Sequence, residues 1–470
     1  MTALDFARAQ FAVTTLLHFI FVPISIGLAL YVAICQTRYY RSGDEVWLRA
    51  TRFWGKFLLI SMAIGVVTGI VQEFQFGMNW SLFSRYVGDV FGAPLAMEGL
   101  IAFFLESTFI GLWIFGWGRL PKRVHLATIW LTAVATMLSA YFIILANGWM
   151  QHPVGYTINH ATGRAELTNI FAVLFNPIAL LGFTHTVLGA ITTGGMLVIA
   201  VSGYLMLRGR RSDVVYRSLR MALPLTLVAV SVTMFVGDSQ GRVLVSQEPM
   251  KMAAAEAVCN SSHGESFSIF SVAGFTDNPC PSQLSSIRIP HLLSLIEDLS
   301  WNGNIRGIDQ IQAAERAQYG PGNYVPPVGV EYWTFRLMIG AGVLMALISL
   351  AGVVLGRGGR LERSRWFARL ALLGLPLPIL ANWCGWIFTE VGRQPWVVFG
   401  LLKTADANSP NVGMTSIVLT LAGYIVIYGV LIAIGAWLMW REVRHGPEPP
   451  AEPGDHPAGQ APSPDLVLAY

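Results

Sequence analysis

The chain alternates between long apolar runs and short polar connections over most of its length. Runs of roughly 20 residues can cross the ~30 Å hydrocarbon core of a bilayer as α-helices. Such runs occur near residues 13-35, 57-75, 93-117, 125-147, 178-207, 219-240, 332-355, 370-390 and 413-440. The pattern predicts an all-α integral membrane protein with nine transmembrane helices in one bundle.

Lysine and arginine are concentrated in alternate connections. The segments 36-56, 118-124, 208-220, 356-369 and 441-446 hold 20 of the 31 basic residues. Nine alternating spans put all five segments on the same side, and the positive-inside rule makes that side the cytoplasm. We therefore expect the N-terminus outside the cell and the C-terminus in the cytoplasm.

The composition agrees with a lipid environment. Only 12% of the 470 residues are charged, against about 25% in soluble domains, and 54% are hydrophobic. This composition excludes soluble enzymes and nucleic-acid-binding proteins, because so few polar residues cannot cover a surface that faces water.

Two stretches are not expected to span the membrane. Residues 241-331 separate the spans within 1-240 from those within 332-445, and they are far longer than an ordinary connection, which predicts a functional extracytoplasmic loop. Cys259 and Cys280 lie in this loop, where oxidising conditions favour a disulfide over two free thiols. Residues 446-470 are predicted to be a disordered cytoplasmic tail, because Pro, Gly, Ala and Glu dominate them.

The clearest chemical signal is a set of polar and sulfur-bearing side chains at matching depths. An ionisable group inside a span costs on the order of 2.5–3.5 kcal/mol, so it needs a cavity, a partner or a cofactor. At about 1.5 Å per residue, four such residues lie within roughly 8–12 Å of the outer edge, and a fifth lies at the end of its span. They are His18, His185, Met338 and Glu98, with Glu390 as the fifth.

These residue types are ligands of haem iron, which in helical bundles is bound from facing helices. Arg336 and Arg393 lie at the same level, and the guanidinium fork binds carboxylates such as haem propionates. Taken singly, each His or Met is better explained by packing, and each Arg equally well by contact with lipid headgroups. The shared depth favours haem binding.

Three motifs carry a family resemblance. They read Glu98-Gly-Leu-Ile-Ala-Phe-Phe-Leu-Glu106-Ser107-Thr-Phe-Ile-Gly111, Asn147-Gly-Trp149-Met150-Gln151-His152-Pro153-Val-Gly155, and Gly385-Trp386-Ile-Phe-Thr-Glu390-Val-Gly392-Arg393-Gln394-Pro395-Trp396. The chain resembles subunit I of the cytochrome bd quinol oxidases from His18 to Trp396.

The resemblance implies an enzyme that oxidises quinol at the outer face and reduces dioxygen to water through three haems. These are a low-spin haem b, a high-spin haem b and a haem d. By motif position, His185 and Met338 resemble the low-spin ligands. His18 and Glu390 resemble the proximal ligands of the other two haems, with Glu98 facing the oxygen site. A bacterial cell membrane, a second membrane subunit (subunit II) and a small single-helix subunit are also implied.

The start of the long loop resembles the quinol-binding segment of the family. Lys251 and Glu256 match a Lys and a Glu that lie five residues apart there. A carboxylate can accept the hydroxyl protons of quinol, and a cation can stabilise the developing quinolate. From spacing alone, a pair of solvated charges on a loop helix is the simpler explanation. The loop resembles that of the short-loop members of the family.

Proton delivery from the cytoplasm requires polar groups deeper in the bundle. Glu106 lies eight residues beyond Glu98, which in an α-helix is about 12 Å deeper and roughly 80° around the axis. Ser107 and Ser139 lie nearby, and Glu106 and Ser107 match positions linked to proton delivery in the family. Trp386 is expected on the electron route between haems. Charge separation would then come from opposite-sided proton chemistry without pumping.

Two other classes of protein remain as alternatives. A proton-coupled transporter would also bury carboxylates, but it predicts broken helices at the midplane and inverted repeats, and we find neither pattern in the sequence. A haem b subunit that conducts electrons to another protein would share the ligands without reducing dioxygen. Haem content distinguishes the three, because only the oxidase carries a chlorin.

Overall fold

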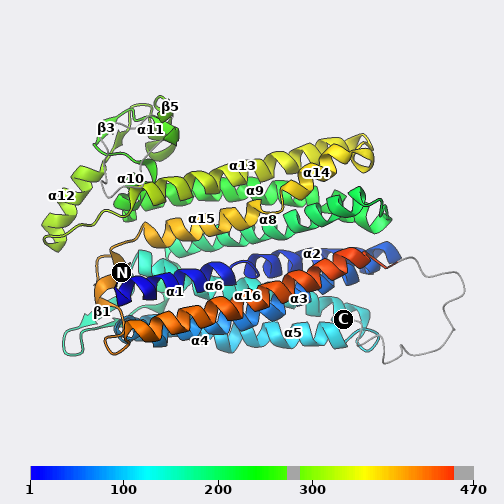
Figure 1. Ribbon diagram of the computed structural model, residues 1–470, viewed down its shortest axis with the longest axis horizontal. Coiled ribbons are helices and arrows are strands. Elements are labelled where there is room, and N and C mark those ends of the chain that lie inside the picture. Colours follow the sequence, from blue (N-terminus) through cyan, green and yellow to red (C-terminus); the bar gives the residue numbers. More distant parts are fainter. Residues whose placement is uncertain (1, 272–285, 449–470) are drawn as a thin grey trace, which may run out of the picture.

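The computed structural model describes residues 2–271 and 286–448. Within these ranges, nine helical segments are long and apolar enough to span a membrane, and each overlaps one of the predicted apolar runs. They lie side by side along the long axis of the molecule (Figure 1). The all-α bundle predicted from the sequence is therefore confirmed.

The first five spanning segments comprise eight α-helices and one π-helix. They are α1 (Ala3–His18) with α2 (Val22–Ser42); α3 (Glu45–Met78); α4 (Ser81–Met97), the π-helix η1 (Glu98–Phe103) and α5 (Phe104–Phe115); α6 (Lys122–Gln151); and the short α7 (Ile170–Leu174) with α8 (Pro177–Leu207).

The last four segments complete the bundle. They are α9 (Asp213–Gln247); α13 (Val328–Arg357); α14 (Arg365–Leu373) with α15 (Leu377–Val391); and α16 (Met414–His445). The 3-10 turns η2 (Leu361–Arg363) and η3 (Thr404–Asp406) lie in connections.

The long segment between α9 and α13 contains short helices and strands. These are α10 (Pro249–Glu256), α11 (Leu292–Asp298), α12 (Ile308–Tyr319), β3 (Ser262–His263), β4 (Phe267–Ser271), β5 (Ser286–Ile289) and β6 (Asn304–Ile305). β3 pairs with β6 and β4 with β5, both antiparallel. Because α9 runs to Gln247 and α13 begins at Val328, the predicted loop boundaries 241 and 331 fall inside the flanking helices. Pro249 explains the end of α9, since proline disfavours a helical residue before it.

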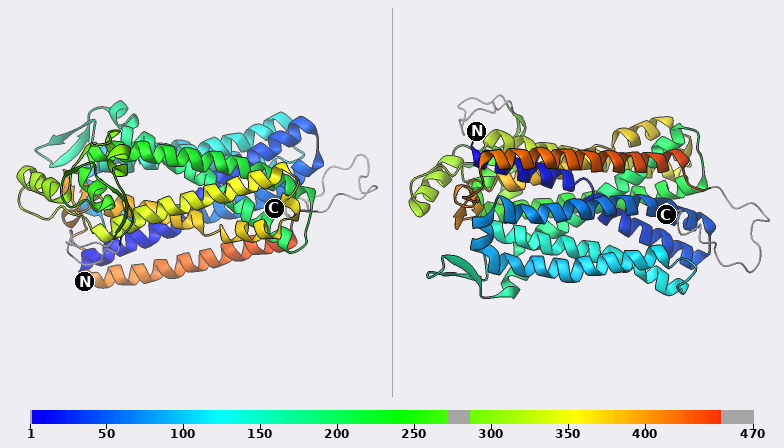
Figure 2. Two further views of the ribbon diagram at one scale, coloured as in Figure 1. Left: turned by 90° about the horizontal axis from the view of Figure 1, so that it is seen from above. Right: turned by 60° about the horizontal axis from the view of Figure 1, so that its bottom comes forward.

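The two ends of the bundle differ in character. We call the end with the N-terminus and α10–α12 the loop end, and the opposite end the tail end (Figures 1 and 2). Two further antiparallel hairpins lie at the loop end, β1 (Tyr156–Asn159) with β2 (Arg164–Leu167) and β7 (Trp396–Val398) with β8 (Leu402–Lys403).

The five basic connections gather at the tail end. Arg217 there forms an ion pair with Asp44, and Lys56 lies 3.5 Å from Glu442. These contacts join connections that are far apart in the sequence, as the predicted alternation of spans requires.

Two predicted spans are bent rather than continuous. The first breaks at Phe19–Phe21, before Pro23 near the start of α2, and the eighth breaks at residues 374–376, before α15. A proline has no backbone N–H and fits best in the first turn of a helix, so each break falls where a new helix begins.

The half of the bundle near the tail end is solidly packed. Its main apolar cluster joins α2, α3, α8 and α9. Gly27 and Gly194 let α2 and α8 meet backbone to backbone, because a Cβ on Gly27 would lie only 2.3 Å from the Ala190 carbonyl oxygen. Trp54 is 1% exposed and donates a 2.8 Å hydrogen bond to Ser218 Oγ. The half near the loop end is hollow instead, and the candidate site lies there.

Cys280 and most of the predicted tail lie outside the described residues. The Cys259–Cys280 disulfide and the disorder of the tail therefore stay predictions, whereas Cys35 and Cys384 are free and buried.

Candidate functional site

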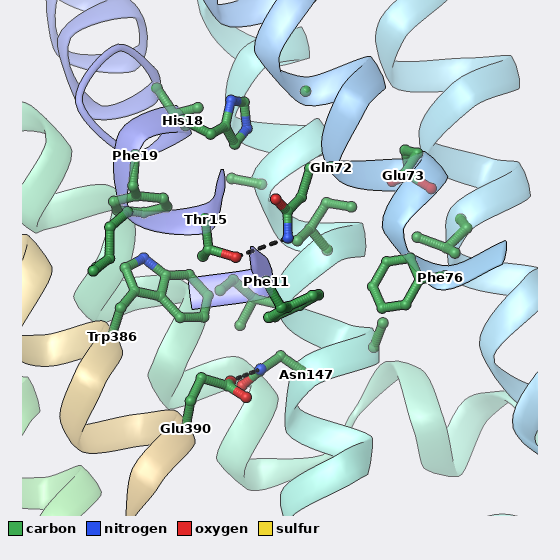
Figure 3. A pocket seen from close by; sticks show the side chains of 18 of the residues that line it. Phe11, Thr15, His18, Phe19, Gln72, Glu73, Phe76, Asn147, Trp386 and Glu390 are labelled. Atoms are coloured by element: carbon green, nitrogen blue, oxygen red, sulfur yellow. Dashed lines mark hydrogen bonds between the residues drawn. The ribbon is translucent and has the colours of Figure 1, made fainter. Parts of the chain in front are cut away.

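A cavity of about 780 Å³ occupies the hollow half of the bundle. Side chains from α1, α3, η1, α5, α6 and α15 line it. Figure 3 shows lining residues of α1, α3, α6 and α15. Its size lies in the range of roughly 300–1,000 Å³ that is common for cofactor sites. Its ionisable lining residues include His18, Glu73, Glu98, Glu106, Glu390 and Arg393. The structure therefore brings three of the five predicted ligands, His18, Glu98 and Glu390, to one space.

His18 is the last residue of α1 and faces this cavity at the break before α2. Its Nδ1 lies 2.8 Å from Thr68 Oγ1, whose hydroxyl also donates to the Ile64 carbonyl. A Cβ on Gly69 would lie 3.2 Å from the Cε1 atom of the ring, so glycine makes room for the imidazole. One ring nitrogen is thus oriented by α3, as in metal-binding histidines whose other nitrogen binds the metal.

Glu390 is near the end of α15 and is held from two sides. Asn147 donates a 2.6 Å hydrogen bond to its Oε1 (Figure 3). Arg393 Nη2 lies 2.5 Å from its Oε2. The Arg393 side chain is only 1% exposed, and its Nε and Nη1 atoms have no partner among the described residues. A buried guanidinium with unused donors fits a second anion, such as a haem propionate.

Glu98 and Glu106 belong to the third spanning segment and both line the cavity. Ser139 of α6 donates a 2.6 Å hydrogen bond to Glu98 Oε1. Regular α-helix geometry predicted the two carboxylates to be roughly 80° apart around the axis. The π-helix η1 begins at Glu98 and ends before Glu106, and it accommodates one extra residue. That residue removes about 100° of rotation, so the two carboxylates lie within about 20° of each other around the axis. The predicted angle is wrong because a π-turn was not expected.

Two other predicted site residues have different surroundings. Ser107 is exposed, donates its hydroxyl to the Phe104 carbonyl and does not line the cavity. Trp386 does line it, with its ring 5.1 Å from that of Phe19 (Figure 3). Glu73 of α3 also lines the cavity and was not predicted; a carboxylate inside an apolar run is the signal that could have identified it.

His185 and Met338 lie on α8 and α13, which both pack against α9 and α15. A Cβ on Gly237 of α9 would lie 3.0 Å from His185 Cε1, and one on Gly385 of α15 would lie 3.2 Å from Met338 Sδ. Among the residues that the structure describes, the buried Nδ1 of His185 has no hydrogen-bond partner of ordinary geometry. An imidazole and a thioether, each facing a glycine, fit the axial pair of a low-spin haem.

Lys251 of α10 is fully buried among polar side chains. Its Nζ lies 2.8 Å from Glu248 Oε2 and donates a 2.9 Å hydrogen bond to Gln151 Oε1. Glu331, at the start of α13, is also buried, and a Cβ on Gly392 would lie 2.5 Å from its Oε2 and 2.7 Å from Lys251 Cγ. The solvated charge that spacing alone favoured is therefore wrong for Lys251, because α10 packs against α9, α12 and α13.

Hydrogen bonds connect Lys251 to the central cavity. Gln151 accepts from Lys251 and donates 2.7 Å to Asn147 Oδ1, and Asn147 in turn donates to Glu390. The hydrogen-bonded path from Lys251 to Glu390 thus passes through the side-chain amides of Gln151 and Asn147, which lie on the last turns of α6. Both lie in the second sequence motif.

Glu256 and Arg336 form a buried ion pair with Nη2 and Oε2 2.5 Å apart. Arg336 also donates a 2.7 Å hydrogen bond to the Ser268 carbonyl and lies over the rings of Phe267 and Tyr332. Burial raises the pKa of Glu256, and the charge of Arg336 opposes this rise. Arg336 thus contacts a loop carboxylate, and its predicted propionate contact stays a prediction.

Glu256 and Lys251 do not share a partner. Their separation of five positions corresponds to about 140° of rotation on α10. Lys251 therefore faces Gln151 and Glu331, and Glu256 faces Arg336. The structure brings both residues inside the loop but on different sides of one helix.

A bundle of membrane helices that directs imidazole, thioether and carboxylate groups inwards defines a membrane-bound protein of the haem-binding class. Residues 6–447 match the family model described as cytochrome bd terminal oxidase subunit I. The chain belongs to this family. Its members are multi-pass proteins of the bacterial plasma membrane that carry haem.

Three similar proteins support the assignment. The chain is 43% identical over 448 residues to the cytochrome bd ubiquinol oxidase subunit 1 of Bacillus subtilis, with 95% of each chain covered. It is 35% identical over 500 aligned positions to the cytochrome bd-II ubiquinol oxidase subunit 1 of Escherichia coli, covering 94% of this chain and 97% of the other. The solved bd oxidase from Geobacillus thermodenitrificans matches with a TM-score of 0.85 at 26% identity, over 95% of this chain and 99% of that one.

Proposed function

We propose that this chain carries out its oxidase reaction at two sites near the loop end. As a cytochrome bd oxidase subunit I, it is a quinol:oxygen oxidoreductase of the bacterial plasma membrane. Dioxygen is reduced in the central cavity, and quinol is oxidised in the loop around α10. The observation that carries this proposal is that His18, Glu98 and Glu390 line one cavity although they come from three separate spans.

The chain would hold three haems: two haem b, one of them low-spin and one high-spin, and a haem d. His185 and Met338 would hold the low-spin haem b, and His18 and Glu390 would hold the other two. The unpaired donors of Arg393 support a propionate contact. When bound, the haems supply electron carriers and the iron at which dioxygen is reduced.

Glu106 and Glu98 deliver protons to the cavity. Their position on one face of the helix around η1 supports this role, since a proton can move between carboxylates through water in the same space. Glu73 is a third carboxylate on that wall. Ser107 contributes to this proton delivery from outside the cavity, since it follows Glu106 in the sequence and its side chain is exposed.

Quinol binds in the loop, with Lys251 and Glu256 as the polar contacts. Glu256 accepts a hydroxyl proton, and the buried Arg336 holds its carboxylate in place. Lys251 supplies the positive charge that stabilises quinolate. The hydrogen-bonded amides Gln151 and Asn147 fix Lys251 relative to the cavity.

The loop end faces the outside of the cell and the tail end faces the cytoplasm. The five basic connections at the tail end support this orientation. Subunit II and a small single-helix subunit complete the oxidase. Because quinol protons leave outside and oxygen protons enter from the cytoplasm, the reaction separates charge without pumping.

The absorption spectrum and oxygen uptake of the purified oxidase test the proposal. We expect haem b bands, an additional chlorin band towards the red end, and oxygen uptake driven by quinol. A protein with haem b but no oxygen uptake would indicate an electron-conducting subunit. A protein without haem would indicate a transporter.

A further inference from the structure

A second, smaller cavity of about 80 Å³ lies beside Glu256 in the loop. Residues of α10, α11 and β6 form most of its wall, together with the end of α9 and the start of α12. The volume is large enough for more than one water molecule, and its wall has the polar groups that water needs. The cavity is separate from the central one, because the two share no lining residue.

Two carboxyl groups on this wall have contrasting surroundings. Glu256 is 6% exposed and is ion-paired with Arg336, which is itself fixed by Ser268 and aromatic rings. Glu297 of α11 is half-buried and has neither an ion pair nor a hydrogen-bond partner among the described residues. One carboxylate is thus held in place, and the other is free to exchange protons with water.

The wall also leads to the surface. Asp298 and Arg306 line the same cavity and are exposed. Exposure therefore increases in steps from Glu256 through Glu297 to Asp298. The cavity therefore offers a proton on Glu256 a polar path to solvent that does not pass through the membrane-spanning bundle.

We propose that Glu297 is the relay residue that takes quinol protons from Glu256 and releases them to the outside. This role rests on the proposed oxidation of quinol at Glu256. Nothing in the three motifs of the sequence points to Glu297, because it lies in the loop outside them.

The proton balance follows from the chemistry of quinol. One quinol loses two electrons to the oxidase and two protons as its two O–H bonds break, and it becomes a quinone. A proton passes to the Glu256 carboxylate, then through cavity water to Glu297, then to solvent. The second proton follows the same route after Glu256 has lost the first one.

Coupling between the two carboxylates drives the release. Burial raises the pKa of Glu297 to about 8, and the negative charge of Glu256 contributes to the rise. When a new proton neutralises Glu256, this repulsion disappears, the pKa of Glu297 falls, and its earlier proton leaves. Other charged groups on the elements around Glu297 include Lys251 of α10, Asp238 and Arg242 of α9, Asp298, Arg306 and, behind Glu256, Arg336.

The experiment compares Glu297→Gln with the wild type in the complete oxidase. Turnover is measured between pH 6 and pH 9 with duroquinol, and with reduced N,N,N′,N′-tetramethyl-p-phenylenediamine, which donates electrons without a proton. We expect wild-type turnover with duroquinol to rise as the pH passes about 8, where Glu297 ionises. In Glu297→Gln the rise should disappear, and kcat at neutral pH should fall about tenfold with unchanged KM.

Three comparisons keep this result specific. Turnover with the proton-free donor and the haem spectrum should stay at wild-type levels in Glu297→Gln, and Glu297→Asp should recover part of the quinol activity. Glu315→Gln is the matched control, because Glu315 is a buried loop carboxyl whose pKa is raised to about 7 but which does not line the cavity. It should behave as wild type.

Wild-type kcat and pH dependence in Glu297→Gln would overturn the relay, as would an equal loss with both donors. Glu256→Gln separates this failure from that of the proposed function. If Glu256→Gln abolishes quinol oxidation while Glu297→Gln does not, only the relay is wrong. If Glu256→Gln also retains full quinol oxidation, the proposed quinol site is wrong as well.

Discussion

Polar side chains inside the spans are oriented by neighbours on other helices. Thr68 fixes His18, Ser139 fixes Glu98 and Asn147 fixes Glu390. Each pair offsets part of the cost of an ionisable group in the membrane. Each also holds the side chain towards the same cavity, which is what a bound iron requires of its ligands.

Met338→Leu should remove the low-spin haem b absorption from the reduced-minus-oxidised difference spectrum. Leucine lacks the sulfur that would bind iron, but it has a similar volume, so the fold should lose less than about 1.5 kcal/mol. Met345→Leu is the control, since Met345 is 4% exposed in the apolar core of the same helix. Identical spectra for both variants and the wild type would refute the ligand role of Met338.

The sequence predicts which residues belong to the candidate site more reliably than it predicts what those residues contact. Matching depth grouped five residues in one layer. His18, Glu98 and Glu390 do line one cavity, whereas His185 and Met338 do not line it. Depth could not predict that Arg336 pairs with Glu256, because that contact depends on how the loop folds back onto α13. Glu331 was missed for the same reason: it lies at the polar start of a span, and only the packing of α10 buries it.

At the scale of elements, apolar length predicts which segments span the membrane but not where they bend. The break at Phe19–Phe21 places His18 at the end of α1, and η1 turns Glu106 towards Glu98. A proline at position 23 gave a signal for the first break. The π-turn has no comparable signal, since its energy depends on packing between helices rather than on residue type.

Deletion of Leu100 tests the geometry of η1. The side chain is 78% exposed, and a π-turn with one residue fewer becomes an α-helical turn, so both flanking helices should keep their orientation. We expect haem content near the wild-type level and a melting temperature within a few degrees of it.

The matched control is deletion of Val134, which is 57% exposed in the regular helix α6. Without a π-turn to absorb the change, this deletion rotates the part of α6 before position 134 by about 100° relative to the part that carries Ser139 and Asn147. It should abolish haem incorporation. Equal damage from both deletions would contradict the account of η1.

The whole molecule is divided into a packed half at the tail end and a hollow half at the loop end. The loop proposed to bind quinol lies at the end of the hollow half, and the hydrogen bonds from Lys251 through Gln151 and Asn147 to Glu390 connect the two. If the protons that form water enter from the tail end, as proposed, they must cross the packed half.

Proton release in proteoliposomes tests this division. With the complete oxidase oriented with its loop end outward, quinol oxidation should release one proton outside for each electron transferred to dioxygen. The protons used to form water come from the opposite compartment, and no further proton is moved. A higher ratio of external protons to electrons, measured from acidification and oxygen uptake, would require a pump.

The most direct test of the central claim is an experimental density map of the purified oxidase that locates each iron and its axial atoms. We expect three irons. One should be bound by His185 and Met338, and the other two should have His18 and Glu390 as their proximal ligands, with Glu98 beside them. Irons bound by other residues, or these side chains directed into lipid, would contradict the claim.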